Sequence, residues 1–208
     1  MSPGAGDPLE RALRESARSA DDAAARLAQE LVERADEAGL VEVAYAPLDT
    51  PLGTMLVAGT DRGLARVVLP RESFDDVLAD LAQRLSPRLV ELPRRVDEVR
   101  RELDEYFAGN RRRFELPLDL TLIKGEFASR VLTGMTEVPF GDAITYSEAA
   151  ALAGSPRAHR AAGNALGSNP IPVVIPCHRV IRSGGAIGNY GGGPEMKRYL
   201  LRHEGFLT

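Results

Sequence analysis

Cysteine and histidine are scarce in this chain, and tryptophan is absent. The 208 residues include one cysteine, Cys177, and three histidines. A single cysteine cannot close an internal disulfide, so the thiol is free and nothing calls for an oxidising compartment. It also cannot supply the several thiolates of a structural zinc site, and so few histidines argue against a catalytic metal. We therefore expect a protein without metal or cofactor that works in the reducing cytoplasm.

Long hydrophobic runs are missing as well. No apolar stretch approaches the roughly 20 residues needed to cross a bilayer, and residues 1–20 lack the basic start and apolar core of a secretory signal. Membrane insertion and secretion are therefore not expected. Hydrophobic residues make up 44% of the chain and charged residues 27%, which is ordinary for a globular protein with a buried core.

Charge is distributed unevenly along the sequence. The formal net charge is −4, which by itself argues against a nucleic-acid partner. Residues 1–120 carry 17 Lys or Arg against 24 Asp or Glu, whereas residues 121–208 carry 9 against 6. The two halves thus differ in sign, and the pattern indicates a mildly basic working surface in the C-terminal half.

The spacing of apolar residues predicts an α+β fold. Residues 9–38 predict a helix, docked or mobile, with a sparse apolar stripe at Leu9, Leu13, Leu27 and Leu31. Two or three antiparallel strands are expected between Val41 and Pro70. A helix capped by Ser73 and a second one ending near Gly109 follow them. After a linker at 111–125, a helix from Phe127 to Met135 begins a mainly helical part. We expect an acidic helical extension at 1–40, a small α+β domain with an antiparallel sheet at 41–120, and a C-terminal domain with a helix-turn-helix at 121–208.

Residues 145–170 predict two short helices with the spacing of a helix-turn-helix. Ser147 is expected to cap the first helix and Ser155 the second. The second helix is built largely from small residues, with Arg157 and Arg160 near its start. Small residues allow either tight packing between helices or close entry into a narrow DNA groove with one arginine as a wedge. The pattern alone leaves both interpretations open.

Cys177 lies in the segment IPVVIPCHRVI, residues 171–181. The apolar residues before it predict a buried strand, and a free cysteine is most often a small core residue. Pro176, however, ends that strand directly before the thiol, at a position where backbone N–H groups and a histidine can stabilise a thiolate. His178 could reach Cys177 only if the chain coils there or a water bridges them, and Glu204 is a candidate to orient the imidazole.

A glycine-rich segment follows the cysteine. Residues 183–194 contain six glycines, which predict a flexible or sharply turned loop. The loop lacks the GK[ST] ending of a phosphate-binding loop. It fits better as a place where backbone approaches a flat ligand that Tyr190 covers.

These segments together resemble the O6-alkylguanine-DNA alkyltransferases, the methylated-DNA–protein-cysteine methyltransferases. The resemblance is carried by PCHRV at residues 176–180, by NPIPVVI before it, and by GGAIGNYGGG and KRYLLRHEG after it. It runs without a gap from about Phe140 to Gly205 and continues more weakly through PLGTMLVAG and the Leu103–Phe107 segment. Residues 1–40 lie outside it. Leu132 stands where relatives commonly carry tryptophan, so a repacked core is expected there.

The resemblance implies a role for each matching residue. Cys177 would accept the alkyl group, and His178 with Glu204 would form a water-bridged relay that deprotonates it. Tyr146 would donate a proton towards guanine N3, and Asn169 would brace the turn that holds the cysteine. The DNA-binding helix would present Arg160, which replaces the flipped nucleotide in the stack, together with Ala161, Arg157 and Gly163. The base pocket would be lined by Tyr190, Gly191, Val180, Gly188 and Pro172.

The implied activity is direct-reversal DNA repair. The alkyl group of O6-alkylguanine would pass irreversibly to Cys177 after nucleotide flipping, so that each molecule acts once; activity on O4-alkylthymine stays open. The expected partner is alkylated double-stranded DNA, bound in the minor groove by a monomer with no obligate protein partner. Three other functions are alternatives: a lesion-binding protein that transfers nothing, a Cys–His hydrolase that turns over, and a plain transcriptional regulator. Cys177 argues against the first, Arg160 against the second, and the glycine loop against the third.

Overall fold

The computed structural model describes the backbone of residues 8–207 and the side chains of residue 10 and residues 15–207. The chain divides into two compact units after Val41. In the first unit, α1 (Pro8–Glu37) is one continuous helix, as expected. Leu27 and Leu31 on this helix are 66% and 69% exposed, while the side chains of Leu9 and Leu13 lie outside the described ones. None of the described helices is long and apolar enough to span a membrane.

The second unit begins with a four-stranded sheet. Its strands are β1 (Val43–Thr50), β2 (Gly53–Thr60), β3 (Gly63–Val68) and β4 (Leu89–Glu91), in the order β3-β2-β1-β4. The first three pair antiparallel, as the sequence predicts, and β4 adds to β1 in parallel. Gly63 is required between β2 and β3, because its φ is +127° and a Cβ there would meet the Pro117 carbonyl oxygen at 2.1 Å.

Helices cover this sheet and complete the N-terminal domain. Ser73 caps α2 (Phe74–Arg84) through a bond from the Asp76 N–H, as expected. Apolar side chains of α2 pack on one sheet face, around Leu81 and Val43. A short 3₁₀ turn, η1 (Pro93–Val96), leads into α3 (Asp97–Phe107), which contacts β1. Helix α3 carries Tyr106, which is fully buried.

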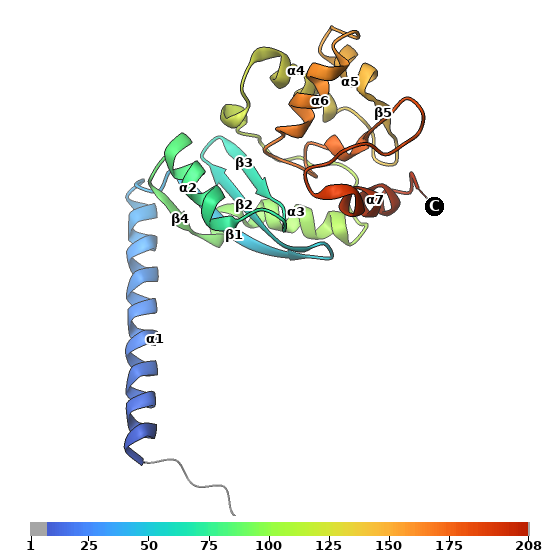
Figure 1. The fold of residues 1–208 in the computed structure, drawn as a ribbon. Coiled ribbons are helices and arrows are strands. Elements are labelled where there is room, and N and C mark those ends of the chain that lie inside the picture. Colours follow the sequence, from blue (N-terminus) through green and yellow to red (C-terminus); the bar gives the residue numbers. More distant parts are fainter. Residues whose placement is uncertain (1–7, 208) are drawn as a thin grey trace, which may run out of the picture. The chain divides into compact units, whose positions relative to one another are not determined.

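The C-terminal domain is mainly helical, which confirms the predicted fold class. Figure 1 shows α4, α5 and α6 grouped together, with α7 following at the end of the chain. The elements are η2 (Leu120–Leu122), α4 (Glu126–Met135), β5 (Ile144–Thr145), α5 (Tyr146–Leu152), α6 (His159–Gly167), η3 (Cys177–Arg179), β6 (Val180–Ile181) and α7 (Gly193–His203). The short strands β5 and β6 pair in parallel, Ile144 with Val180 and Thr145 with Ile181. This pairing brings the start of α5 beside the segment that contains Cys177.

The two helix caps expected near α5 and α6 are wrong. Thr145 rather than Ser147 caps α5, and it forms a capping box with Glu148. Helix α6 begins only at His159, and its N-cap residue is Ala158, which has no side-chain oxygen to act as a cap. The Ser155 carbonyl instead accepts the Ala158 N–H in a separate turn. The second helix is therefore shorter than the sequence predicts.

The strand expected at residues 171–175 is also absent. These residues form a buried turn in which the Ile175 N–H bonds to the Ile171 carbonyl at 2.9 Å. Val173 at its tip has φ +74°, the left-handed region that a β-branched residue rarely adopts. The apolar run is thus core, as expected, but the chain reverses instead of extending.

Candidate active site

Asn169 organises the turn in front of Cys177. Its Nδ2 donates to the Ile175 carbonyl at 2.9 Å and to the Cys177 sulfur at 3.1 Å, while its Oδ1 accepts the Ile171 N–H at 2.9 Å. The buried side-chain amide of Asn169 is therefore hydrogen-bonded to the first and last residues of the turn and to the thiol. Because these groups are buried, each bond satisfies a polar atom that would otherwise be costly to leave unpaired.

Cys177 begins the 3₁₀ turn η3, so the chain does coil at this point. The thiol residue is 7% exposed, and it lines a pocket of about 720 Å³. Burial raises the pKa of Cys177, and the hydrogen bond from Asn169 and the charge of Lys197 oppose that rise only in part. The resting sulfur is therefore a protonated thiol that needs a base to become a nucleophile.

His178 is fully buried beside a carboxylate. Its Nε2 lies 2.9 Å from Oε1 of Glu204. Because the carboxylate can only accept, His178 must carry its proton on Nε2, which leaves Nδ1 as an unprotonated acceptor. The Nδ1 atom is buried and has no hydrogen-bond partner among the described residues. Burial lowers the pKa of His178 despite the attraction of Glu204, so the ring is a neutral base in its resting state.

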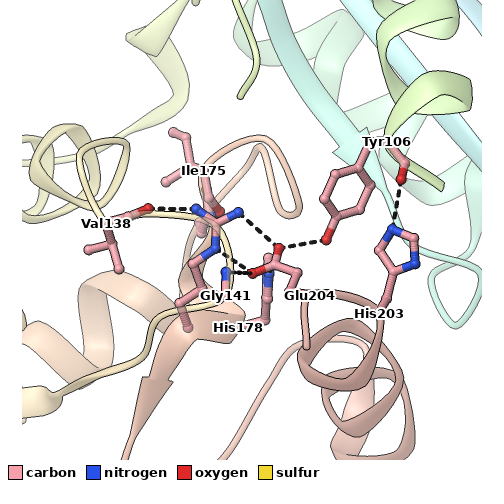
Figure 2. A network of polar contacts seen from close by, with 9 residues as sticks. Tyr106, Val138, Gly141, Ile175, His178, His203 and Glu204 are labelled. Atoms are coloured by element: carbon pink, nitrogen blue, oxygen red, sulfur yellow. Dashed lines mark hydrogen bonds and ion pairs between the residues drawn. The ribbon is translucent and has the colours of Figure 1, made fainter. Parts of the chain in front are cut away.

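Glu204 is held by more groups than the sequence indicates. Arg179 binds its carboxylate with Nε at 2.7 Å and Nη2 at 2.8 Å, and the hydroxyl of Tyr106 donates to Oε1 at 2.7 Å. Figure 2 shows this network, with Tyr106 and His178 converging on Glu204. Burial opposes ionisation, but the hydrogen bonds from His178 and Arg179 hold the pKa of Glu204 well below its usual range. The carboxylate is therefore a permanent anion.

The pocket in front of Cys177 contains several of the predicted residues. It is lined by Thr145, Tyr146, Ser147, His159, Arg160, Gly163, Asn164, Leu166, Gly167, Cys177, Arg182, Ser183, Asn189, Tyr190 and Gly191. Among the described residues that line it there is no carboxylate, whereas two are arginines. A pocket of this charge suits a ligand with an anionic backbone.

Other predicted residues lie outside the lining of this pocket. Val180 and Pro172 are buried, the first in β6 and the second in the turn before the cysteine. Ala161 is exposed on α6, and Arg157 lines a separate surface depression with Ser155, Pro156 and Ala158. Gly188 lies next to a lining residue instead of in the lining. Its φ is +68°, and a Cβ there would meet the Tyr146 hydroxyl at 2.9 Å.

The small residues of α6 lie partly against neighbouring helices and partly on the surface. Ala162 and Ala165 are buried, and α6 contacts α4 and α5, so part of the pattern is tight helix packing. Ala161, Gly167 and Ser168 are exposed on the same helix or at its end, next to exposed Arg160. The outer surface of α6 is therefore lean and carries one long cationic side chain near its beginning.

Four functional candidates were not singled out from the sequence. Tyr106 and Arg179 bind Glu204, and Arg182 lines the pocket. Lys197 is fully buried, and its Nζ donates to the carbonyls of Val180 and Asn189. Burial lowers the pKa of Lys197 to about 8. Arg179 lies in PCHRV and Lys197 in KRYLLRHEG, so the family resemblance of these two segments could have indicated both residues. No group of three or more His, Cys, Asp or Glu suited to a metal ion occurs among the described residues.

Known proteins share this architecture. The ribonuclease-like domain of 6-O-methylguanine DNA methyltransferase matches residues 43–120, and the DNA-binding domain of the same family matches residues 126–206. The methylated-DNA–protein-cysteine methyltransferase of Mus musculus is 38% identical over 173 residues, covering 79% of this chain and 82% of the relative. The constitutive one of Bacillus subtilis is 34% identical, covering 77% and 94%. The crystal structure of Mycobacterium tuberculosis OGT in complex with DNA aligns with a TM-score of 0.67 at 33% identity, covering 77% of this chain and 92% of that one.

Proposed function

The chain belongs to the 6-O-methylguanine DNA methyltransferase family and is a DNA-repair methyltransferase, and we propose that it moves the alkyl group of O6-alkylguanine irreversibly to its own Cys177. The observation that carries this proposal is a thiol that lines an acid-free pocket and is followed directly by a buried histidine–carboxylate pair. The carboxylate fixes the histidine as a base, and the base activates the thiol.

Activation of the thiol requires a proton path from Cys177 to His178. The raised pKa of Cys177 means that the proton must be removed for attack, and the neutral Nδ1 of His178 is the available acceptor. A single water can bridge the sulfur and Nδ1. The anionic Glu204, held by Arg179, then stabilises the imidazolium that forms.

The transfer itself is a displacement at the alkyl carbon. The sulfur–carbon bond forms as the carbon–O6 bond breaks, and the electron pair of that bond passes into the guanine ring. Tyr146, whose ring lines the pocket, donates its proton towards N3 so that guanine leaves as a neutral base. The tyrosinate regains a proton from the relay through solvent. Because the product thioether has no hydrolysis route, each protein molecule acts once.

Access to O6 requires that the nucleotide leave the duplex. Flipping costs a few kcal/mol, and an inserted side chain offsets part of it. Arg160 is exposed near the start of α6 and also lines the pocket, which suits a residue that fills the vacated stack. Ala161 and Gly163 keep the same helix thin enough for the minor groove, and Arg157 contributes positive charge beside it. Residues 121–208 are only mildly basic, so we expect few phosphate contacts and an affinity that falls with salt on a shallow slope.

The flipped base would lie against the glycine-rich loop. Tyr190 and Gly191 line the pocket, and Tyr190 contributes a broad ring surface against which a base can stack. Val180 and Pro172 act from behind, as buried supports of the cysteine turn, and Gly188 allows the loop to approach Tyr146. We assign the lesion pocket to Tyr190, Gly191 and Cys177, with Val180, Pro172 and Gly188 as its supports.

We further propose that the chain acts as a cytoplasmic monomer without cofactor or obligate protein partner. Within it, residues 1–40 form an extension, 41–120 the N-terminal domain, and 121–208 the DNA-binding and alkyl-acceptor domain. The lone free cysteine fits a reducing compartment. Sedimentation of the protein with and without duplex DNA tests the monomer.

One experiment tests the central proposal. The purified protein is mixed with excess duplex containing a single O6-methylguanine, and its intact mass and modified peptide are measured. We expect one added methyl group, located on Cys177, and no second round of repair. Cys177→Ala is the matched control, which should bind the duplex and gain nothing. Unchanged wild-type mass with lesion binding would indicate a damage sensor, and repeated turnover would indicate a hydrolase-type enzyme.

A further inference from the structure

Three side chains donate to the Glu204 carboxylate, and they come from two domains. His178 and Arg179 belong to η3, directly after the cysteine, whereas Tyr106 belongs to α3 of the N-terminal domain. All three meet at Oε1, at 2.9, 2.8 and 2.7 Å. Figure 2 shows the Tyr106 hydroxyl reaching this oxygen from the side opposite the Val138 and Ile175 segments. Every other residue of the proposed relay lies in the C-terminal domain.

The position of the Tyr106 hydroxyl is tightly fixed. Tyr106 is fully buried, and its ring makes edge contacts with Phe107, Phe140 and His203. Its backbone carbonyl is bonded to Nε2 of His203 at 2.7 Å, one residue before Glu204. Two hydrogen bonds therefore join one tyrosine to two consecutive residues at the end of α7. Burial, together with the nearby Glu204 charge, raises the pKa of Tyr106 far above its usual value, so the phenol is always a neutral donor.

We propose that Tyr106 is a positioning residue of the alkyl-transfer relay, through which the N-terminal domain holds the Glu204 carboxylate in register with His178. This inference rests on the proposed function. The Tyr106 hydroxyl binds Glu204 and does not line the pocket for the thiol and the flipped guanine, so it acts only through Glu204. Without its hydroxyl, the shared oxygen loses one of three donors and the carboxylate can turn about its last side-chain bond. The carboxylate then spends part of its time outside the geometry that fixes the His178 tautomer, which slows transfer, but Oε1 with one donor fewer is a stronger acceptor whenever it binds Nε2.

The charged and titratable groups around the relay predict how this loss would appear. Glu204 faces His178, Arg179 and Tyr106, and it also faces the Gly141 N–H at 3.5 Å. His178 additionally senses the charge of Lys197, and its ring lies 6.3 Å from that of Tyr190. Removing the neutral hydroxyl changes none of these charges. It leaves more electron density on Oε1 for the Nε2 proton of His178, so His178 becomes more basic. The acid limb of the pH–rate profile should therefore move to higher pH.

Tyr106→Phe is the variant that tests this, because it removes one oxygen and keeps the ring. The rate of transfer is measured from free O6-benzylguanine and from duplex O6-methylguanine, between about pH 5 and 9. We expect a loss of about tenfold with both substrates, as for a lost hydrogen bond to a charged group, an acid limb shifted upwards, and unchanged affinity for duplex DNA. Tyr199→Phe is the matched control: its ring stacks on His203 at 6.1 Å and belongs to α7, and it should keep the wild-type profile.

A double-mutant cycle with Glu204→Gln separates positioning from general loss of structure. If Tyr106 acts through Glu204, the second substitution should add little to the first. Multiplicative effects, or a slower Tyr106→Phe with an unshifted acid limb, would overturn the inference and reduce Tyr106 to a core residue. A wild-type rate and profile in Tyr106→Phe would overturn it as well. If the wild-type protein itself transferred nothing, the proposed function would fail instead, so the two failures are distinguishable.

Discussion

The amide nitrogen of Asn169 lies 3.1 Å from the Cys177 sulfur and 2.9 Å from the Ile175 carbonyl. One side chain thus sets both the shape of the reversed turn and the surroundings of the nucleophile. The turn needs such support because Val173 occupies the left-handed region, which costs on the order of 1–3 kcal/mol.

Asn169→Ala should therefore weaken both the fold and the thiol. The buried Ile175 carbonyl and Ile171 N–H lose their partner, and we expect the free energy of unfolding to fall by about 2–4 kcal/mol. The pKa of Cys177 should rise further, because the Asn169 hydrogen bond lowers it. Urea unfolding and the pH dependence of iodoacetamide labelling measure the two effects. Ser168→Ala, at the exposed neighbouring position, should stay within about 0.5 kcal/mol of wild type. Equal loss in both variants would contradict this role.

Acid should destabilise the protein in two stages. Burial lowers the pKa of His178 below its unfolded value of 6.5, so the unfolded state binds more protons as pH falls through 6.5. Glu204 has a pKa held far below its unfolded value of 4.5, so its contribution is complete above pH 4.5 and is lost below it. Urea midpoints should decline as the pH falls through about 6.5 and decline again below about pH 4.5. His178→Gln should lack the first decline, and a variant that keeps it would assign that decline to other groups.

Arg160 and Arg157 offer a direct test of nucleotide flipping. Both are exposed arginines, but Arg160 lines the pocket that contains Cys177 and Arg157 lines a separate depression. Arg160→Ala should slow repair of duplex O6-methylguanine by tenfold or more, because tenfold corresponds to about 1.4 kcal/mol, a part of the few kcal/mol that flipping costs, and it should leave reaction with free O6-benzylguanine within about twofold. Arg157→Ala should lower duplex affinity mildly and spare the rate. An equal loss on both substrates for Arg160→Ala would count against a role in flipping.

Sequence alone predicted the α+β class and the residues of the cysteine segment, because both depend on local patterns. Apolar periodicity separates the sheet from the helices, and PCHRV places a thiol next to a histidine. His178 and Glu204 are 26 residues apart in the sequence, and their pairing is predicted by the family resemblance and not by periodicity. The structure brings these two groups together, with Glu204 at the C-terminal end of α7.

Two features could not have been predicted in this way. Tyr106 is 98 residues from Glu204, and in sequence it is indistinguishable from a core residue of an amphipathic helix. The chain reversal places the β-branched Val173 at positive φ, which such residues rarely adopt. Burial of the turn and the hydrogen bonds of Asn169 stabilise it there. Local propensity describes neither case, because a distant group or an unfavourable dihedral angle decides the outcome.

Gly188 provides the sharpest test of how the loop and Tyr146 depend on each other. Gly188 and Gly185 both have left-handed φ, +68° and +81°, so alanine should strain the backbone at either position by about 1–2 kcal/mol. Only at Gly188 would the new Cβ meet another group, the Tyr146 hydroxyl at 2.9 Å; at Gly185 no atom lies within 4 Å among the described residues. The two alanine variants should therefore carry similar backbone strain, and they differ in that only Gly188→Ala places a methyl group against the Tyr146 hydroxyl.

We expect Gly188→Ala to slow alkyl transfer by tenfold or more, which is part of the roughly hundredfold or larger contribution of one general acid, because the displaced hydroxyl no longer lies where guanine N3 needs its proton. Gly185→Ala should transfer within about twofold of wild type while losing similar stability. Thermal unfolding and single-turnover rates with free O6-benzylguanine measure both properties in the two variants. Equal rates would show that the loop tolerates the added methyl group and that the position of the Tyr146 hydroxyl is not set by Gly188.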